Sequence, residues 1–286
     1  MYYALIILST AIFAGGFLLN DVYRKLSGST VKASLQYTFL SSLAGLIGLF
    51  LINGFLFEFT PFTFIIALLS ALNGFGFSFC AFKALNHINL SVYSVFSMLG
   101  GMLLPFLQGI FFYGEKLTVA KALCLLFIVA ALLCTIEKGK AKGFIYYLGI
   151  FTLNGMSGVL SKIFASSNLP NTSAAGYSIL TALCSTVIAA FILIGMAIKN
   201  KEPFFPSVKA TIVSAVGGIS NRLANFWLVI ALMHVDASVQ YPLVTGGVMI
   251  GSTIASCFTE NKPKRNDIIS VVLAFIGMLI LFVIPI

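Results

Sequence analysis

Apolar residues form long, continuous runs along the whole chain, and short polar connections separate these runs. Each run holds roughly 18–25 residues, which is the length that an α-helix needs to cross a bilayer. Helices are expected because a spanning segment must satisfy its backbone hydrogen bonds within itself. The pattern therefore predicts an all-α membrane protein with ten transmembrane helices. The predicted spans are residues 2–20, 33–52, 62–83, 92–112, 118–136, 144–165, 173–197, 209–231, 238–258 and 267–284.

Glycine and proline, which tend to end helices, fall between the runs at Gly28, Pro61, Gly139, Pro170 and Pro203. Composition supports this division, since 59% of the 286 residues are hydrophobic and only 9% are charged. A soluble domain has about 25% charged residues, so a water-soluble globule and a disordered chain are both excluded. The connections are too short to hold a separate soluble domain, and any function must lie within the membrane or at its surface.

The chain carries a net charge of +9, and its cationic residues gather in the connections. The odd-numbered connections hold 13 Lys and Arg residues, and the even-numbered connections hold three. Because Lys and Arg in short loops stay on the cytoplasmic side, we expect a multi-pass cell-membrane protein with both termini outside the cytoplasm. No basic face persists along a helix, so the expected partner is the lipid bilayer and not nucleic acid.

Two segments about half a chain apart are closely similar. Residues 84–92 read A-L-N-H-I-N-L-S-V and residues 231–239 read A-L-M-H-V-D-A-S-V, with five of nine positions identical. They indicate two five-helix units, residues 1–137 and 142–286. Because five is odd, the second unit must enter the membrane from the opposite side, which makes an inverted repeat. Such a repeat provides two nearly equivalent states, each open to one side, and is typical of alternating-access transporters.

Arg222 is the one charged residue that the pattern places near the middle of a span. It lies 13 residues after Lys209 and 12 before His234, so each end of the helix is about 18–20 Å away. A central arginine costs about 2.5–3.5 kcal/mol on insertion scales, and no acidic residue is placed mid-membrane to pair with it. Two interpretations stay open: Arg222 binds a substrate carboxylate or phosphate, or it bonds to the backbone carbonyls of broken helices.

Other polar side chains recur at helical spacing on several predicted helices, which places them on common faces. Close packing through small residues is one explanation, and the lining of a substrate cavity is the other. The helices over 118–136 and 267–284 have few polar residues and are expected outside such a cavity. The predicted substrate-binding residues are Arg222, Asn225, Asn221, Asn154, Ser157, Asn73, Ser94, Ser97, Tyr241, Thr245 and the single tryptophan, Trp227.

No arrangement of residues predicts catalysis. The chain has no H-E-x-x-H, G-x-S-x-G or phosphate-loop motif and no paired carboxylates within a span, so we expect no enzyme activity, no cofactor and no metal. His87 and His234 occupy matching positions in the two halves. Inversion would place them on opposite membrane faces, away from any shared metal site.

The segments that close the fourth and ninth predicted helices are also related, F-F-Y-G-E-K-L-T over 111–118 and C-F-T-E-N-K-P-K over 257–264. With the two five-helix halves, the repeat at 84–92 and Pro242, they carry a resemblance of the whole chain to the ten-helix EamA-like branch of the drug/metabolite transporter superfamily. The resemblance implies inverted halves, transport of a small molecule and cytoplasmic termini. The chain lacks the tryptophans that the family often has in its first and sixth helices, so no particular substrate is implied.

We therefore expect a secondary transporter that moves a small polar or amphipathic organic solute by alternating access. The solute would be an amino-acid-like or other metabolite with an anionic group. A transporter of organic cations or drugs, held by an aromatic box among the 28 phenylalanines, stays open. So does a non-transporting membrane subunit or a component of a lipid flippase. A polar central cavity would favour transport, and both a monomer and a homodimer are compatible with the sequence.

Overall fold

The computed structural model describes the chain except for residues 29, 86–89, 135–143, 201–202, 258–264 and 285–286. The described residues form ten α-helices and no β-strand, which confirms the predicted all-α character. Each helix coincides with one of the predicted apolar segments. The helices are α1 (Tyr2–Ser27), α2 (Val31–Ile52), α3 (Pro61–Leu85), α4 (Leu90–Tyr113), α5 (Val119–Cys134), α6 (Phe144–Ala165), α7 (Ala174–Asn200), α8 (Val208–Leu232), α9 (Ala237–Cys257) and α10 (Arg265–Val283).

Several helices have the length and hydropathy of membrane spans. Within the described residues, five stretches are long and apolar enough to cross a bilayer: Val31–Ile52, Pro61–Cys80, Leu148–Ala165, Ala174–Lys199 and Val208–Leu232. Shorter apolar stretches occur in α1, α4, α5 and α10. Many large apolar side chains face outward, as expected of a protein embedded in lipid. A membrane crossing by each of the other five helices stays a prediction.

Local sequence explains where several helices begin and end. The Thr30 hydroxyl accepts a hydrogen bond from the Ala33 amide at the start of α2 (3.1 Å). Ser207 accepts one from the Ala210 amide at the start of α8 (3.4 Å). Such caps satisfy amides that have no partner in the first helical turn. Gly28 follows α1 with a φ of 76°, a left-handed conformation that residues with a Cβ rarely adopt.

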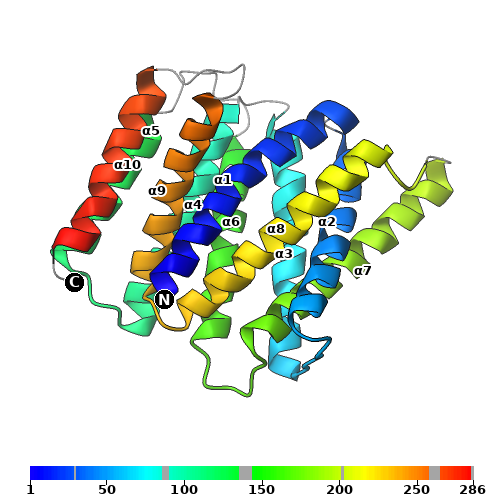
Figure 1. The fold of residues 1–286 in the computed structure, drawn as a ribbon, viewed down its shortest axis with the longest axis horizontal. Coiled ribbons are helices and arrows are strands. Elements are labelled where there is room, and N and C mark those ends of the chain that lie inside the picture. Colours follow the sequence, from blue (N-terminus) through cyan, green and yellow to red (C-terminus); the bar gives the residue numbers. More distant parts are fainter. Residues whose placement is uncertain (29, 86–89, 135–143, 201–202, 258–264, 285–286) are drawn as a thin grey trace.

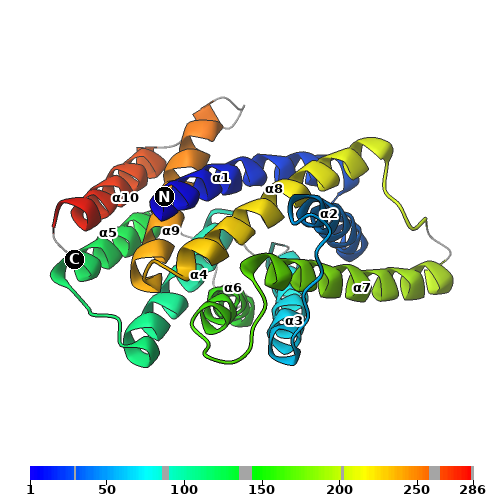
Figure 2. The same ribbon diagram turned by 60° about the horizontal axis from the view of Figure 1, so that its bottom comes forward.

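The helix contacts follow a pattern that recurs when each helix is exchanged for the one five later. Helix α1 packs on α8 and α9, and α6 packs on α3 and α4; α2 contacts α8, and α7 contacts α3. Three contacts are unchanged by this exchange: α2 with α7, α4 with α9, and α5 with α10. Figures 1 and 2 show α5 and α10 side by side at one edge. In Figure 1, α1 rises from the labelled N-terminus while α6 descends, and α5 and α10 also run in opposite directions.

Two buried apolar clusters hold the helices together. One joins α5 and α10 to α4 and α9 and includes Met102, Ile128 and Leu132. The other joins α3, α6, α7 and α8 and includes Phe164 and Tyr177, whose rings stack with centroids 4.3 Å apart. Well-packed clusters of this kind give the helices fixed relative positions, so the polar faces turned toward the middle of the bundle also have fixed positions.

Glycines bring the central helices into close contact. An added Cβ at Gly218 of α8 would collide with the backbone of Ser41 in α2. At Gly100 of α4, it would collide with the backbone of Phe151 in α6. The backbones therefore touch at both crossings, as small residues allow between membrane helices. These crossings determine which faces of α8 and α6 remain open toward the central space.

Candidate functional site

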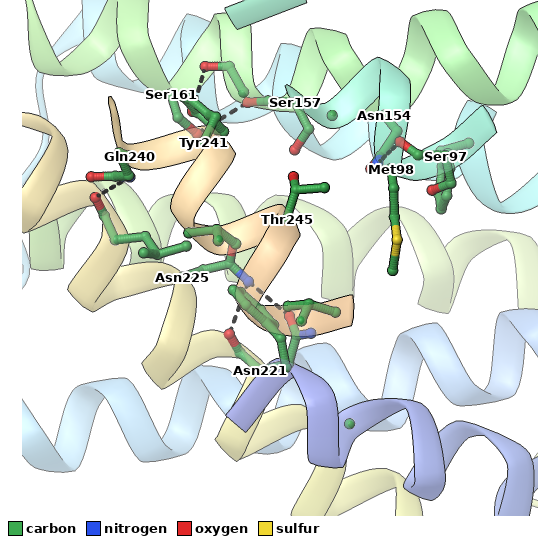
Figure 3. Close-up of a pocket in the computed structure, with 18 of the residues that line it drawn as sticks. Ser97, Met98, Asn154, Ser157, Ser161, Asn221, Asn225, Gln240, Tyr241 and Thr245 are labelled. Carbon is green, nitrogen blue, oxygen red and sulfur yellow. Dashed lines mark hydrogen bonds between the residues drawn. The ribbon is translucent and has the colours of Figure 1, made fainter. Parts of the chain in front are cut away.

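A cavity of about 480 Å³ lies among the central helices. It is bounded by α1, α3, α4, α6, α8 and α9, with Tyr37 of α2 at its edge. Helices α5 and α10 do not contribute to this lining, as the sequence predicted. Figure 3 shows the polar side chains turned toward the space from α4, α6, α8 and α9. They are Ser97, Asn154, Ser157, Ser161, Asn221, Asn225, Gln240, Tyr241 and Thr245.

A second cavity of about 500 Å³ adjoins the first and is bounded by α1, α2, α3, α6, α7 and α8. The linings of the two cavities share Ser157, Ser161, Asn221 and Asn225, so the cavities adjoin along these polar residues. Hydroxyl side chains dominate the polar lining of the second cavity. Arg24 and Arg222 are the charged residues of that lining, and no acidic side chain lines either cavity in the described part of the chain.

Arg222 extends from α8 into the second cavity and is hydrogen-bonded only to neutral groups among the described residues. Its Nη2 donates to the hydroxyls of Ser42 in α2 and Ser185 in α7, each at 3.2 Å. The stem of the side chain passes over Gly45, where an added Cβ would collide with Cγ of Arg222. A guanidinium has five N–H donors, so donors remain for a ligand. The predicted alternative, bonding to the carbonyls of broken helices, is not the arrangement found.

The hydroxyls around Arg222 are themselves held by their helices. Ser185 donates to the carbonyl of Thr181 at 2.8 Å, and Thr181 donates to the carbonyl of Tyr177 at 2.9 Å. The Tyr177 hydroxyl lies 3.0 Å from the Ser70 hydroxyl. Since the proton of Ser185 is used within α7, its oxygen is free to accept from Arg222. These contacts stabilise the guanidinium without neutralising its charge.

Asn221 and Asn225 lie one turn apart on α8 and are both exposed to the shared part of the space. The Asn225 amide donates to the backbone carbonyl (2.9 Å) and the side-chain Oδ1 (2.8 Å) of Asn221. Opposite them on α6, the Ser161 hydroxyl donates to the carbonyl of Ser157 at 3.0 Å (Figure 3). Amide and hydroxyl groups therefore line the route between the two cavities.

Four further predicted residues line the first cavity, namely Ser97, Asn154, Tyr241 and Thr245. The Asn154 amide donates to the carbonyl of Ser97 at 2.6 Å, which joins α6 to α4. The Tyr241 hydroxyl donates to the carbonyl of Gly158 at 3.0 Å, which joins α9 to α6. Thr245 lies one turn after Tyr241 on the same face of α9. Asn154 and Tyr241 are therefore packing residues as well as lining residues.

The remaining predicted residues are placed differently. The Asn73 amide donates to the carbonyl of Leu153 at 2.8 Å, so it joins α3 to α6, and it lines neither cavity. Trp227 also lines neither cavity, and the side chain of Ser94 falls outside the described residues. The prediction did not include Ser42 and Ser185, which accept the hydrogen bonds of Arg222. The spacing of Ser178, Thr181 and Ser185 along one face of α7 was an available signal.

Beyond Tyr241, a buried ion pair lies at the end of the bundle where α6 ends and α9 begins. Glu115, in the connection between α4 and α5, pairs with Lys162 of α6 at 2.8 Å, and the two side chains are 5% and 8% exposed. The Glu115 carboxylate also accepts from the amides of Ala237 and Ser238, each at 2.9 Å, and from the Ser238 hydroxyl at 2.6 Å. Glu115 therefore connects the first residues of α9 to α6.

The electrostatic balance at Glu115 favours the ionised form. Burial alone would raise the pKa of the Glu115 carboxyl, but hydrogen bonds from Lys162, Ser238 and Ala237 outweigh burial and lower the pKa below its ordinary value of 4.5. The carboxylate is thus charged throughout the neutral range. No cluster of three or more potential metal ligands occurs in the described part of the chain.

Comparison with known proteins gives the fold and nothing about function. No family model matches the chain, and no curated protein matches it. Among solved structures, 29 chains are similar. One of them, described only as a crystal structure of a protein, has a TM-score of 0.75 and 17% sequence identity, and the match covers 99% of each chain. This likeness over the full length shows that the arrangement of helices is shared with a protein of known structure.

Proposed function

We propose that this chain is a secondary transporter, of the drug/metabolite transporter type, for a small organic solute with an anionic group. The solute binds in the two adjoining polar cavities, and Arg222 binds its carboxylate or phosphate. The solute crosses the membrane as the two ends of the space open in turn. This function accounts for a polar space of this size in the middle of a bundle whose outer surface is apolar.

The observation that carries the proposal is the environment of Arg222. Among the described residues, its hydrogen-bond partners are the neutral hydroxyls of Ser42 and Ser185, and no described acidic side chain lines either cavity. A cation in a membrane interior normally pairs with an opposite charge or marks a ligand site. An anionic substrate would supply the missing charge, with Asn221 and Asn225 available to bond its other polar groups.

The arrangement of helices supports alternating access. The contacts recur on exchange of each helix for the one five later, which is the relation expected of two five-helix halves in an inverted repeat. The second cavity reaches Arg24 and Gly28, at the end where α1 stops. The opposite end holds the buried Glu115–Lys162 pair. At that end the pair joins α6 to the start of α9.

The loop charges orient the molecule in the membrane. The end where α1 stops is the end of the odd-numbered connections, which hold 13 of the Lys and Arg residues. By the positive-inside rule, this end faces the cytoplasm and both termini face outward. The Glu115–Lys162 pair then lies at the outer end.

An organic cation is a second candidate because aromatic side chains line the same space. Phe13, Tyr37, Phe77 and Tyr241 contribute to the first cavity, and rings of this kind can hold a quaternary amine. The cationic Arg222 opposes this candidate, since it would repel such a ligand at close range.

A thermal-shift screen on the purified full-length protein separates the candidates. The probes are benzoate, L-glutamate, inorganic phosphate, L-phenylalanine and choline, each tested on the native protein and on Arg222→Gln. The proposal expects stabilisation of the native protein by a carboxylate or phosphate probe, and loss of that stabilisation in the variant. Stabilisation by choline alone would favour the cation transporter. Stabilisation by no probe, or an anion effect that is the same in Arg222→Gln, would contradict the proposal.

A further inference from the structure

The Glu115–Lys162 pair lies next to the polar space and not in an independent part of the fold. Lys162 follows Ser161, which lines both cavities, and it lies one helical turn after Gly158, which lines the first. Tyr241 covers this turn through its hydrogen bond to the carbonyl of Gly158. Lys162 therefore belongs to the helical turn that Tyr241 contacts, next to residues that line the first cavity.

The opening of this end of the bundle has to break contacts of Glu115. Glu115 connects the start of α9 to the end of α6, so separation of these helices parts the carboxylate either from the α9 amides or from Lys162. Removing one partner from a buried ion pair leaves an uncompensated charge in a poorly hydrated site. An opening that parts the ion pair must therefore supply another anion to Lys162 or neutralise one of the partners.

Neutralisation by a proton does not fit the surroundings of Glu115. The groups that face it are Lys162 from α6, the amides of Ala237 and Ser238 with the Ser238 hydroxyl from α9, and nearby Tyr241. All of the hydrogen bonds are donated to the carboxylate, so its charged form is the one that this site stabilises. Near neutral pH, the remaining way to compensate Lys162 is an anion from outside the chain.

We propose that Lys162 is a second binding site for the substrate's anionic group, which Glu115 occupies in the closed state and which the substrate takes over as the outer end opens. This inference rests on the proposed function, since it requires an anionic substrate. The route is already polar: Asn221, Asn225, Ser157 and Ser161 lie along the space between Arg222 and the turn that carries Lys162. The substrate's anion passes from Arg222 to Lys162, and Glu115 is the competitor that it displaces.

If the substrate competes with Glu115 for Lys162, substitutions of these two residues should change the apparent Kd of the anion in opposite directions. If the pair only holds the helices together, both substitutions should change it in the same direction. Glu115→Gln removes the carboxylate that competes for Lys162. A larger fraction of the protein can then bind the anion, and the apparent Kd of the anion falls. Lys162→Gln removes the site, so the apparent Kd rises. We expect at least about a fivefold change in each direction. In the double variant Glu115→Gln/Lys162→Gln the gain should disappear, because it acts through Lys162.

The measurement is the Kd of benzoate and of inorganic phosphate for the purified full-length protein in lipid nanodiscs, by isothermal titration calorimetry. Asp236→Asn is the matched control, because it removes one negative charge from the neighbouring pair with Lys121 (2.7 Å) without touching Lys162. Its Kd should equal that of the native protein. Circular dichroism and size-exclusion chromatography establish that each variant is folded.

The outcomes separate this inference from the proposed function. Tighter binding by Glu115→Gln, weaker binding by Lys162→Gln and no change in Asp236→Asn support a second site. Changes of the same sign in the first two variants, no change in either, or an equal gain in Asp236→Asn overturn it. If Arg222→Gln abolishes binding in the same experiment, the proposed function stands regardless. If neither probe binds the native protein, or if Arg222→Gln binds as tightly as the native protein, the result contradicts the proposed function, on which this inference depends.

Discussion

Arg222 is a cation whose hydrogen-bond partners, among the residues that the structure describes, are neutral oxygens. Ser42 and Ser185 accept its hydrogen bonds at 3.2 Å each, and Ser185 can do so because its own proton is donated to Thr181. Hydroxyls compensate part of the desolvation of a guanidinium, but they leave its charge in place. An anion that enters the cavity therefore gains both Coulomb attraction and charge-assisted hydrogen bonds.

Substitutions at Arg222 should distinguish the contribution of its charge to anion binding from the contribution of its planar shape. Arg222→Lys keeps the charge but loses the planar fork that matches a carboxylate, so we expect weaker binding of benzoate. Arg222→Gln loses the charge as well and should weaken binding further, by roughly 10–100-fold if the lost bonds are worth about 1.5–3 kcal/mol. Calorimetry on the three proteins measures this order. Equal affinity in all three would mean that the guanidinium does not contact the ligand.

A glycine in the lining of the second cavity offers a test of whether the solute passes through that cavity. Gly74 of α3 lines the second cavity, and an added Cβ there meets no atom within 4 Å. Gly74→Leu should fill part of the cavity and reduce transport without unfolding the protein. Gly195→Leu in α7 is the control, because an added Cβ there also meets no atom within 4 Å, the residue lines neither of the two cavities, and the substitution gains the same helix propensity. Equal transport by the two variants would show that the second cavity is not on the solute's path.

At the scale of helices, the sequence predicts the positions of the helices much better than the contacts between their side chains. Continuous apolar runs placed all ten helices, because the number of residues that spans a bilayer is fixed by helix geometry. Helical spacing also placed Asn221, Arg222 and Asn225 on one face of α8. It did not show that Asn73 packs against Leu153 or that Ser42 and Ser185 hold Arg222. Small polar residues serve packing and cavity lining equally well, and only the neighbouring helix decides between them.

The Glu115–Lys162 pair gives a prediction about stability and pH. Glu115→Gln leaves Lys162 buried without its partner, which should destabilise the protein by about 3–5 kcal/mol at neutral pH. Because the pKa of Glu115 is lowered in the folded protein, the stabilisation by its charge is full above the ordinary pKa near 4.5 and disappears as pH falls through the lowered pKa. The melting temperatures of the two proteins should differ at pH 7, and the difference should shrink as the pH falls through the lowered pKa of Glu115.

Glu58→Gln is the control for this experiment. Glu58 accepts hydrogen bonds from the amide (2.6 Å) and the hydroxyl (2.7 Å) of Ser173 at the start of α7. It forms no ion pair in the described part of the chain, so its loss should have a smaller effect. A melting temperature of Glu115→Gln equal to that of the native protein at pH 7 would contradict the assigned role of the carboxylate.

At the scale of the whole molecule, the orientation in the membrane decides which end of the cavity opens to the cytoplasm. The loop charges place the even-numbered connections outside, whereas the family resemblance places them inside. Asn168, exposed between α6 and α7, and Thr30, exposed between α1 and α2, lie in connections of opposite type. In a background without native cysteines, an impermeant thiol reagent applied to intact cells should label Asn168→Cys and leave Thr30→Cys unlabelled. The reverse pattern would favour the orientation of the family.

Transport through the Arg222 cavity is tested most directly by uptake into proteoliposomes. Native protein and Arg222→Gln are reconstituted at equal amounts, and liposomes preloaded with unlabelled benzoate are diluted into trace labelled benzoate, so that exchange through the protein accumulates label. Native protein should accumulate benzoate above empty liposomes, and inorganic phosphate serves as the second anionic probe in parallel. Arg222→Gln should accumulate no more than empty liposomes, although it folds and reconstitutes normally. Accumulation by Arg222→Gln equal to that of the native protein, or no accumulation of either anion by the native protein, would contradict anion transport through Arg222.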